Sequence, residues 1–157
     1  MNLSQYTIAE TTQITSPALV YYKDIIKRNI DRAIEIAGNA RRLWPHVKTH
    51  KMQQMVRMQI DAGITKFKCA TIAEAEMLAT TPVADVLVSY PLIGPNIDRF
   101  VKLSTTFPDV TCWAIGDNYD QLAILSDKAE QAGIQVPLLI DIDFGMHRTG
   151  FPLDGDV

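Results

Sequence analysis

The chain has 157 residues, which is long enough for one domain with a sizeable hydrophobic core. Its residues are 47% hydrophobic and 21% charged, and the formal net charge of −3 gives no reason to expect nucleic acid or an anionic membrane as a partner. No apolar run is long enough to span a bilayer, and the polar first 15 residues lack the order of a signal peptide. The sequence therefore predicts a cytoplasmic protein.

The first predicted elements are a strand and a helix. Residues 18–22 form an apolar run that predicts a strand. Asp24 can cap the helix that follows, because its carboxylate can accept the free amides of the first turn. Ile26 and Ile30 begin an apolar helical face, which we expect to end at Gly38.

A basic cluster follows the second predicted strand. Residues 43–47 predict a strand that ends at Lys48, and a helix is predicted from there to Gly63. In α/β proteins, ligands bind at the turns that follow the carboxyl ends of strands. A partly desolvated lysine among other cationic groups has a lowered pKa, which frees its amine for Schiff-base chemistry with a carbonyl. The alternative is a solvated basic turn, and local composition alone favours that alternative.

The rest of the chain repeats the strand-helix pattern. Thr71 and Glu74 have the spacing of a capping box at the start of one of the helices. Cys69 and Cys112 fall inside predicted strands without metal-ligand spacing, which indicates buried thiols of a reducing compartment. Further strands are predicted at residues 67–70, 85–90, 110–115 and 137–143.

This rhythm predicts a parallel sheet with crossover helices. The predicted strands are apolar runs, as expected for strands that are covered on both faces. Either an open doubly wound sheet or a (β/α)8 barrel would satisfy the pattern. No Gly-x-Gly-x-x-Gly follows a strand, which argues against the dinucleotide-binding version of the open sheet. A barrel needs eight strands, and only about five successive strand-helix units follow the first strand.

A second informative stretch, residues 141–151, reads Asp-Ile-Asp-Phe-Gly-Met-His-Arg-Thr-Gly-Phe. Asp141 and Asp143 leave an apolar strand, where buried carboxylates need partners, and Arg148 is the obvious one. One interpretation is a salt-bridged turn that fixes the end of the strand. The functional interpretation is that Arg148 holds an anionic oxygen of a ligand while a carboxylate orients it.

Three further residues are candidates on weaker grounds. His46 and His50 flank Lys48, and their roles stay open, with His46 kept as a candidate for cofactor binding. A zinc pair is not expected, because no third ligand of suitable spacing is nearby, so no metal ligands are assigned. Tyr90, at the end of a strand, could reach a bound cofactor, although a tyrosine at such a rim is more often packing.

Both stretches resemble one family. Residues 45–51, Pro-His-Val-Lys-Thr-His-Lys, look like the signature of the D-threonine aldolase and D-serine dehydratase family of fold type III, alanine-racemase-like enzymes. Residues 141–150 are similar to the Asp-x-Gly-Met-x-Arg-x-Gly element of the same barrels. The resemblance implies a (β/α)8 barrel that binds pyridoxal 5'-phosphate.

The resemblance also implies roles for individual residues. The lysine matching Lys48 carries the cofactor and then acts as a base, and the arginine matching Arg148 donates to the phenolic oxygen of the cofactor. At the position of Asp141, relatives often have a lysine modified to carry a carboxylate, which steadies the arginine. We therefore expect Asp141 to approach Arg148 directly or through one water molecule.

The activity implied is that of a lyase acting on a D-β-hydroxy amino acid, by aldol cleavage or by dehydration. The resemblance also implies a divalent metal, whose ligands would lie beyond residue 157, and we expect a homodimer for the full-length form. An amino-acid racemase and a non-catalytic pyridoxal-phosphate carrier are the alternatives.

Residues 1–157 are expected to form the amino-terminal part of such a barrel domain. The rest of the barrel and a carboxyl-terminal β domain would then be absent. A piece of this kind leaves an unclosed sheet edge, so we expect the isolated chain to be inactive.

Overall fold

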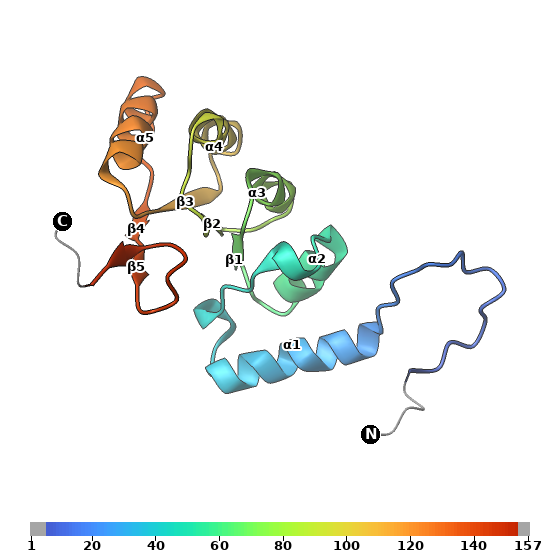
Figure 1. The fold of residues 1–157 in the computed structure, drawn as a ribbon. Coiled ribbons are helices and arrows are strands. Elements are labelled where there is room, and N and C mark those ends of the chain that lie inside the picture. The colour runs from blue at the N-terminus through green and yellow to red at the C-terminus, as the bar shows by residue number, and fades with distance from the viewer. Residues whose placement is uncertain (1–5, 154–157) are drawn as a thin grey trace.

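The structure is a computed structural model that describes residues 6–153 (Figure 1). Its helices are α1 (Lys23–Ala37), α2 (Gln53–Asp61), α3 (Ile72–Ala79), α4 (Pro95–Thr106) and α5 (Tyr119–Gln131), with two short 3-10 turns, η2 (Ala40–Arg42) and η3 (Val47–Thr49). Its strands are β1 (Lys66–Cys69), β2 (Asp85–Val88), β3 (Thr111–Gly116), β4 (Leu138–Ile140), β5 (Ile142–Asp143) and β6 (Phe151–Pro152). Within the described residues, no helix is both long and apolar enough to cross a membrane.

Strands β1 to β4 form one parallel sheet in chain order. In an open doubly wound sheet the strand order reverses at a switch point, whereas strands in chain order with helices on one side form the wall of a barrel. Helices α2 to α5 lie along the convex side of the curved sheet in Figure 1. The prediction of a barrel built from parallel strand-helix units is thus confirmed, and the open sheet is excluded.

Three of the predicted strands differ from the structure, and one of them, at residues 137–143, is divided between β4 and β5, which belong to different sheets. Residues 18–22 are not a strand; Leu19 is 85% exposed, and no segment among residues 6–153 pairs with this stretch. The strand predicted at residues 43–47 is reduced to a single bridge between His46 and Lys68, next to a hydrogen bond from the Lys68 N–H to the Pro45 carbonyl (3.0 Å). Pro45 has no N–H to donate, and the chain turns into η3 directly afterwards.

The first helix also begins differently from the prediction. Tyr22 is the N-cap of α1, and its side chain makes no capping hydrogen bond to the helix, so Asp24 lies inside the first turn. A carboxylate at that position still interacts favourably with the amino end of the helix. The predicted end is confirmed, since Gly38 adopts a left-handed conformation with φ 76°.

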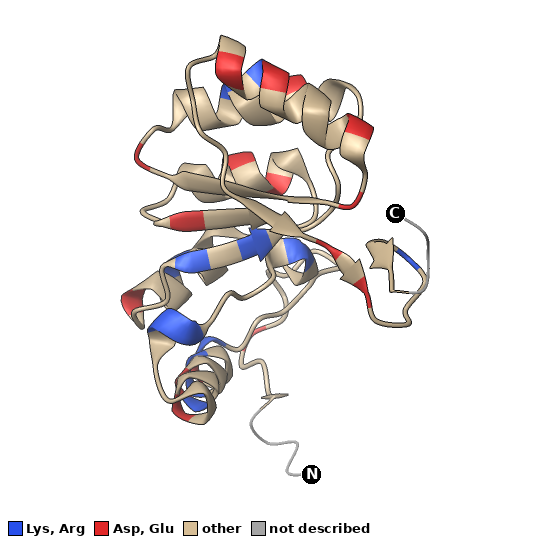
Figure 2. Cartoon of the chain, turned by 90° about the vertical axis from the view of Figure 1, so that its left-hand side faces the viewer, with Lys and Arg blue, Asp and Glu red and all other residues tan. Residues whose placement is uncertain are grey.

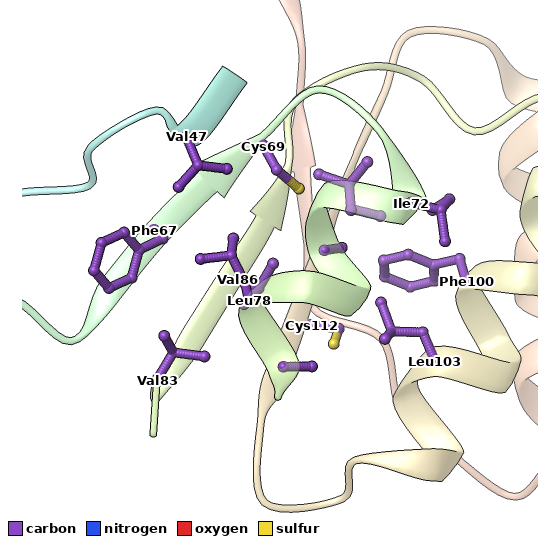
Figure 3. Packing of buried hydrophobic residues seen from close by; sticks show 14 of the residues in the cluster. Val47, Phe67, Cys69, Ile72, Leu78, Val83, Val86, Phe100, Leu103 and Cys112 are labelled. Atoms are coloured by element: carbon purple, nitrogen blue, oxygen red, sulfur yellow. The ribbon is translucent and has the colours of Figure 1, made fainter. Parts of the chain in front are cut away.

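The core lies between the sheet and the helices (Figure 3). Alternate residues of the strands are fully buried there, among them Phe67, Val86 and Cys69, and they meet Leu78 of α3 and Phe100 of α4. Both cysteines are free and buried, as predicted. Burial raises the pKa of Cys69 to about 12, so this thiol has no nucleophilic role at neutral pH.

The opposite, concave face of the sheet carries both charged and apolar side chains and is only partly covered, which corrects the expectation of strands covered on both faces. Trp44 and Trp113 make an edge-to-face contact there, with ring centroids 6.1 Å apart. The indole N–H of Trp113 donates to Asp85 (2.8 Å), and the Lys66 ammonium lies 5.3 Å from the Trp44 ring centroid. A four-stranded wall leaves this inner face open, so polar and aromatic groups satisfy one another across it.

Charge is distributed unevenly over this fold. Most basic residues precede residue 69, and in Figure 2 they gather over α1 and β1, whereas acidic residues dominate the later helices. The turn that carries Lys48 therefore lies in the basic part of the chain.

Candidate functional site

The candidate site lies where parallel strands end at one edge of the sheet. Three segments meet this edge: the turn of residues 46–51, Ser89 and Tyr90 after β2, and the loop of residues 141–150 around β5. We call the first the lysine turn and the third the arginine loop. In barrels, the carboxyl ends of the strands form the face on which active sites are built.

One buried residue fixes the lysine turn in place. Val47 is completely buried in the core, while its neighbour Lys48 is exposed. The carbonyl of Val47 accepts hydrogen bonds from the N–H groups of His50 (3.1 Å) and Lys51 (2.8 Å). Since the turn closes around Val47, the Lys48 side chain projects away from the core.

His46 caps the lysine turn and connects it to β2. Its Nδ1 accepts from the Lys48 N–H (3.3 Å), and its Nε2 lies 3.4 Å from Ser89 Oγ, which itself donates to the Cys69 carbonyl (2.8 Å). An accepting Nδ1 places the ring proton on Nε2, where it can donate to Ser89. Burial and the positive charges of Lys48 and Lys68 lower the pKa of His46, which favours this neutral ring. His46 therefore serves first as the cap of the turn.

His50 has a similar local role on the other side of Lys48. Its Nδ1 accepts from the N–H of Met52 (3.1 Å), at the beginning of α2. Burial lowers the pKa of His50, so the neutral ring that can accept this bond is favoured. Both imidazoles flanking Lys48 are thus used as hydrogen-bond acceptors for the backbone.

Lys51 is held by a buried carboxylate. Its ammonium forms an ion pair with Glu74 Oε1, and Glu74 Oε2 accepts from the Ala70 N–H (2.8 Å). Burial alone would raise the pKa of Glu74, but the hydrogen bonds from Lys51 and Ala70 outweigh it and lower the pKa. The predicted capping box is confirmed on one side, since Thr71 Oγ1 accepts from the Glu74 N–H (3.2 Å). The carboxylate, however, reaches Ala70 rather than Thr71.

Lys48 differs from Lys51 in having no such partner. Within residues 6–153, the Lys48 amine makes no hydrogen bond or ion pair. The lysine turn therefore presents one unpaired primary amine at the carboxyl edge of the sheet. An amine of this kind can add to the carbonyl carbon of an aldehyde.

The structure brings Tyr90 and Arg148 together. The guanidinium carbon of Arg148 lies 5.7 Å from the centroid of the Tyr90 ring, a geometry in which the cation is attracted to the face of the ring. Tyr90 directly follows Ser89, which contacts His46. The two halves of the candidate site are thus connected through the end of β2.

The predicted direct pairing of Arg148 with a carboxylate is wrong. In the part of the chain that the structure describes, Arg148 forms no ion pair with Asp141 or Asp143. Asp143 instead accepts from the N–H groups of Gly145 (2.8 Å) and His147 (2.9 Å), and its Oδ2 lies 3.2 Å from His147 Nδ1. These short-range backbone donors lower the pKa of Asp143 and compete successfully for its carboxylate.

Asp141 contributes through its backbone. Its N–H donates to the Gly116 carbonyl (2.9 Å), and its own carbonyl accepts from the Phe151 N–H (3.0 Å). It therefore connects the end of β3 with the start of β6, at the base of the arginine loop. Its carboxylate forms no ion pair within the described residues, so no direct contact supports its predicted role in steadying Arg148.

The arginine loop closes through a contact that sequence reasoning missed. Asp117 Oδ2 accepts from the Gly150 N–H (2.8 Å), while the neighbouring Asn118 is the N-cap of α5. Gly150 has φ 100°, and a Cβ there would lie 2.5 Å from the backbone nitrogen of Asp143.

Ser89 and Lys51 are the other residues missed as parts of the site. A serine after a strand gives no signal on its own, and its role depends on the distant His46 ring.

Within the described residues, no group of three His, Cys, Asp or Glu side chains could hold a metal ion.

Comparison with known proteins extends this description. The family described as alanine racemase, N-terminal domain, matches residues 23–156. The 3-hydroxy-D-aspartate aldolase of Paracoccus denitrificans is 30% identical over 144 residues, which cover 90% of this chain and 37% of the relative. The chain thus spans little more than a third of the length of this relative.

Solved structures agree with the sequence comparison. The crystal structure of D-threonine aldolase from Filomicrobium marinum superposes with a TM-score of 0.80 at 26% identity, over 88% of this chain and 37% of that protein. The D-threo-3-hydroxyaspartate dehydratase from Delftia sp. HT23 gives a TM-score of 0.80 at 25% identity, over 90% of this chain and 37% of that protein.

Proposed function

Because this chain belongs to the family of alanine racemase N-terminal domains, we propose that it supplies the cofactor-binding part of a pyridoxal-phosphate-dependent lyase. The reaction would be aldol cleavage or dehydration of a D-β-hydroxy amino acid. Relatives that match the chain include aldolases and dehydratases, and each of them is named for a D-amino acid of this class as its substrate. We further propose that residues 1–157 are the amino-terminal part of the barrel domain.

One observation supports this proposal most directly: among the described residues, the Lys48 amine has no partner, and it lies on a fixed turn. The turn is fastened by the buried Val47, by the His46 cap and by the ion pair of Lys51. A nucleophile that must meet a cofactor at one position needs this kind of support from its neighbours. A basic turn with only a solubilising role would need neither the buried anchor nor the cap.

The residues present fit pyridoxal phosphate. The Lys48 amine is suited to hold an aldehyde, and the Arg148 guanidinium is suited to hold an anionic oxygen. Tyr90 keeps the guanidinium in place without neutralising it, so the positive charge stays available to a ligand. When bound, the cofactor withdraws electrons from the bond of the substrate that is to be broken.

Lys48 would have two tasks in turn. It would first hold the cofactor through Nζ, and once replaced by the substrate amine, it would take up or deliver a proton at Nζ. His46 would support both tasks by keeping the Lys48 backbone fixed, because its Nδ1 is engaged with the Lys48 N–H. We assign no proton transfer to His46 itself.

A metal ion has no counterpart among the described residues, which contain no cluster of ligands for it. We therefore assign no step to a metal. Homodimer formation and a cytoplasmic location of the complete protein stay predictions.

The test is reduction with borohydride in the presence of pyridoxal phosphate, followed by peptide mapping of the complete protein. We expect the label on Lys48, and we expect Lys48→Ala to lose both the imine absorbance and turnover, the latter by at least about a thousandfold. Label on Lys51 in the unmodified protein would contradict the assignment of Lys48. Absence of label on either lysine would contradict the proposed function.

A further inference from the structure

We infer that Glu74 is a positioning residue that reserves Lys48 as the reactive lysine by binding its neighbour Lys51. The inference rests on the proposed function, and it adds a residue that has no part in holding the cofactor. It begins from a problem of selection. Two primary amines lie three residues apart on one turn, and both are accessible to a ligand.

Exposure does not distinguish the two lysines. The side chain of Lys51 is 60% exposed even with its ion pair formed, and Lys48 is also exposed. The difference lies in their partners, because Lys51 binds Glu74 and Lys48 binds no group within residues 6–153. An ammonium held by a carboxylate has no lone pair with which to attack a carbonyl carbon.

Glu74 is itself firmly placed. Its side chain is only 4% exposed, and one of its oxygens is bound to the N–H of Ala70, at the end of β1. Its own N–H is bound by Thr71, so both the backbone and the side chain are fixed at the first turn of α3. A buried carboxylate needs a cation or several donors, and Lys51 is the cation that this site receives.

The backbone of Lys51 shows why this contact also shapes the turn. Lys51 has φ 51°, a left-handed conformation that residues other than glycine rarely adopt. In this conformation its N–H reaches the Val47 carbonyl (2.8 Å) and its side chain reaches α3. The ion pair thus compensates a strained residue that closes the turn around Lys48.

The chemistry involved is condensation of an amine with an aldehyde. The amine nitrogen bonds to the aldehyde carbon, and the aldehyde oxygen leaves as water, with no change of oxidation state. Either lysine could carry out this step if its amine were free. Removing the charge of Glu74 would therefore create a second reactive amine on the same turn.

The test compares Glu74→Gln with Glu76→Gln in the complete protein. Glu76 lies two residues further along the same helix and pairs with Arg99, so it provides a control for loss of one ion pair at α3. The cofactor-free proteins are treated with a limiting amount of an amine-acylating ester, and modification of each lysine is measured by peptide mapping. This measurement needs neither turnover nor a bound cofactor.

We expect Lys51 to react more slowly than Lys48 in the unmodified protein. Glu74→Gln should raise the ratio of Lys51 to Lys48 modification by about fivefold, as expected for loss of one partly exposed ion pair, and Glu76→Gln should leave it unchanged. In borohydride reduction with pyridoxal phosphate, Glu74→Gln should divide the label between the two lysines.

Equal reactivity of the two lysines in the unmodified protein would overturn the inference, even if Glu74→Gln failed to fold. An unchanged ratio in a folded Glu74→Gln protein would overturn it as well. If borohydride labelled neither lysine, the proposed function would fail, whereas the acylation ratio would still show whether Glu74 restrains Lys51.

Discussion

The lysine turn and the arginine loop hold their cations in place by different kinds of contact. Each holds one cation at the carboxyl edge of the sheet, and each contains a left-handed residue that is not glycine, Lys51 (φ 51°) or His147 (φ 52°). The lysine turn is fastened to other elements, through Val47 in the core and Glu74 on α3. The arginine loop is joined to other elements at its base, by Gly116 and Asp117, whereas its tip is held only within the loop, by the carboxylate of Asp143.

This difference indicates how firmly each cation is placed. Contacts to separate elements of the core keep the lysine turn in one position unless the fold itself opens. A loop closed by its own Asp143 can keep its internal shape and still move as a unit, with Phe144 and Met146 82% and 77% exposed. We therefore expect Lys48 to be pre-positioned, and Arg148 to depend on its contact with Tyr90.

The largest expected effect comes from the anchor of the lysine turn. Val47→Ala removes two methyl groups from a completely buried position, so it should lower the free energy of unfolding by about 2 kcal/mol. Met146→Ala in the exposed part of the arginine loop should change it by less than about 0.5 kcal/mol. Denaturant unfolding of both variants measures the contrast. Equal losses would show that the loop is packed as firmly as the turn.

An effect of similar size is expected at the base of the arginine loop. Gly150→Ala places a Cβ 2.5 Å from the Asp143 nitrogen at φ 100°, so it should destabilise the folded loop by about 2 kcal/mol. Gly145→Ala is the matched control, because Gly145 also has a positive φ (107°) but nothing lies within 4 Å of the added Cβ; its cost should be about 1 kcal/mol. Hydrogen exchange of the loop amides would report the difference. If the two variants behaved alike, the cost of both substitutions would come from the positive φ of the backbone and not from the close approach of the added Cβ to Asp143.

The smallest effects are expected on acidification, in separate pH windows for the two segments. The pKa of His46 is lowered from 6.5 and that of Asp143 from 3.8. A group with a lowered pKa binds fewer protons in the folded state than in the unfolded state. Its stabilisation is therefore complete above the unfolded value and is lost as the pH falls through the folded value.

The amide signals of Lys48 and His147 should accordingly respond at different pH. The Lys48 N–H loses its acceptor when His46 is protonated, below pH 6.5, whereas the His147 N–H loses its acceptor only when Asp143 is protonated, below pH 3.8. One NMR titration of the complete protein measures both. A single shared midpoint would mean that the two segments respond as one unit.

The parts that could be predicted from sequence are those determined by local pattern. The end of α1 at Gly38, the buried Cys69 and Cys112 and the Thr71 cap depend on one residue and its near neighbours, and all are confirmed. The repeating strand-helix units predicted that the strands are parallel, whereas their order in the sheet was decided by the structure. Periodicity is a reliable signal for such elements, because it reflects one buried face.

The errors occurred where a residue had several possible partners. Arg148 was expected beside Asp141 because the family resemblance places a carboxylate there. In the structure, the amides of Gly145 and His147 bind the carboxylate of Asp143, and the guanidinium of Arg148 contacts the ring of Tyr90. Residues 18–22 were expected to be a strand because they are apolar, yet a strand also needs a neighbour. Which distant groups meet cannot be deduced from the composition of a single stretch.

The contact between Trp44 and Trp113 has a consequence for spectroscopy. These are the two tryptophans of the chain, and both lie on the concave face of the sheet, with Lys66 beside one ring and Asp85 bound to the other. The intrinsic tryptophan emission of residues 1–157 therefore comes from a single small region. The wavelength of this emission should shift when water enters the barrel interior or a ligand fills it, and it should not change on substitution of exposed residues of the outer helices.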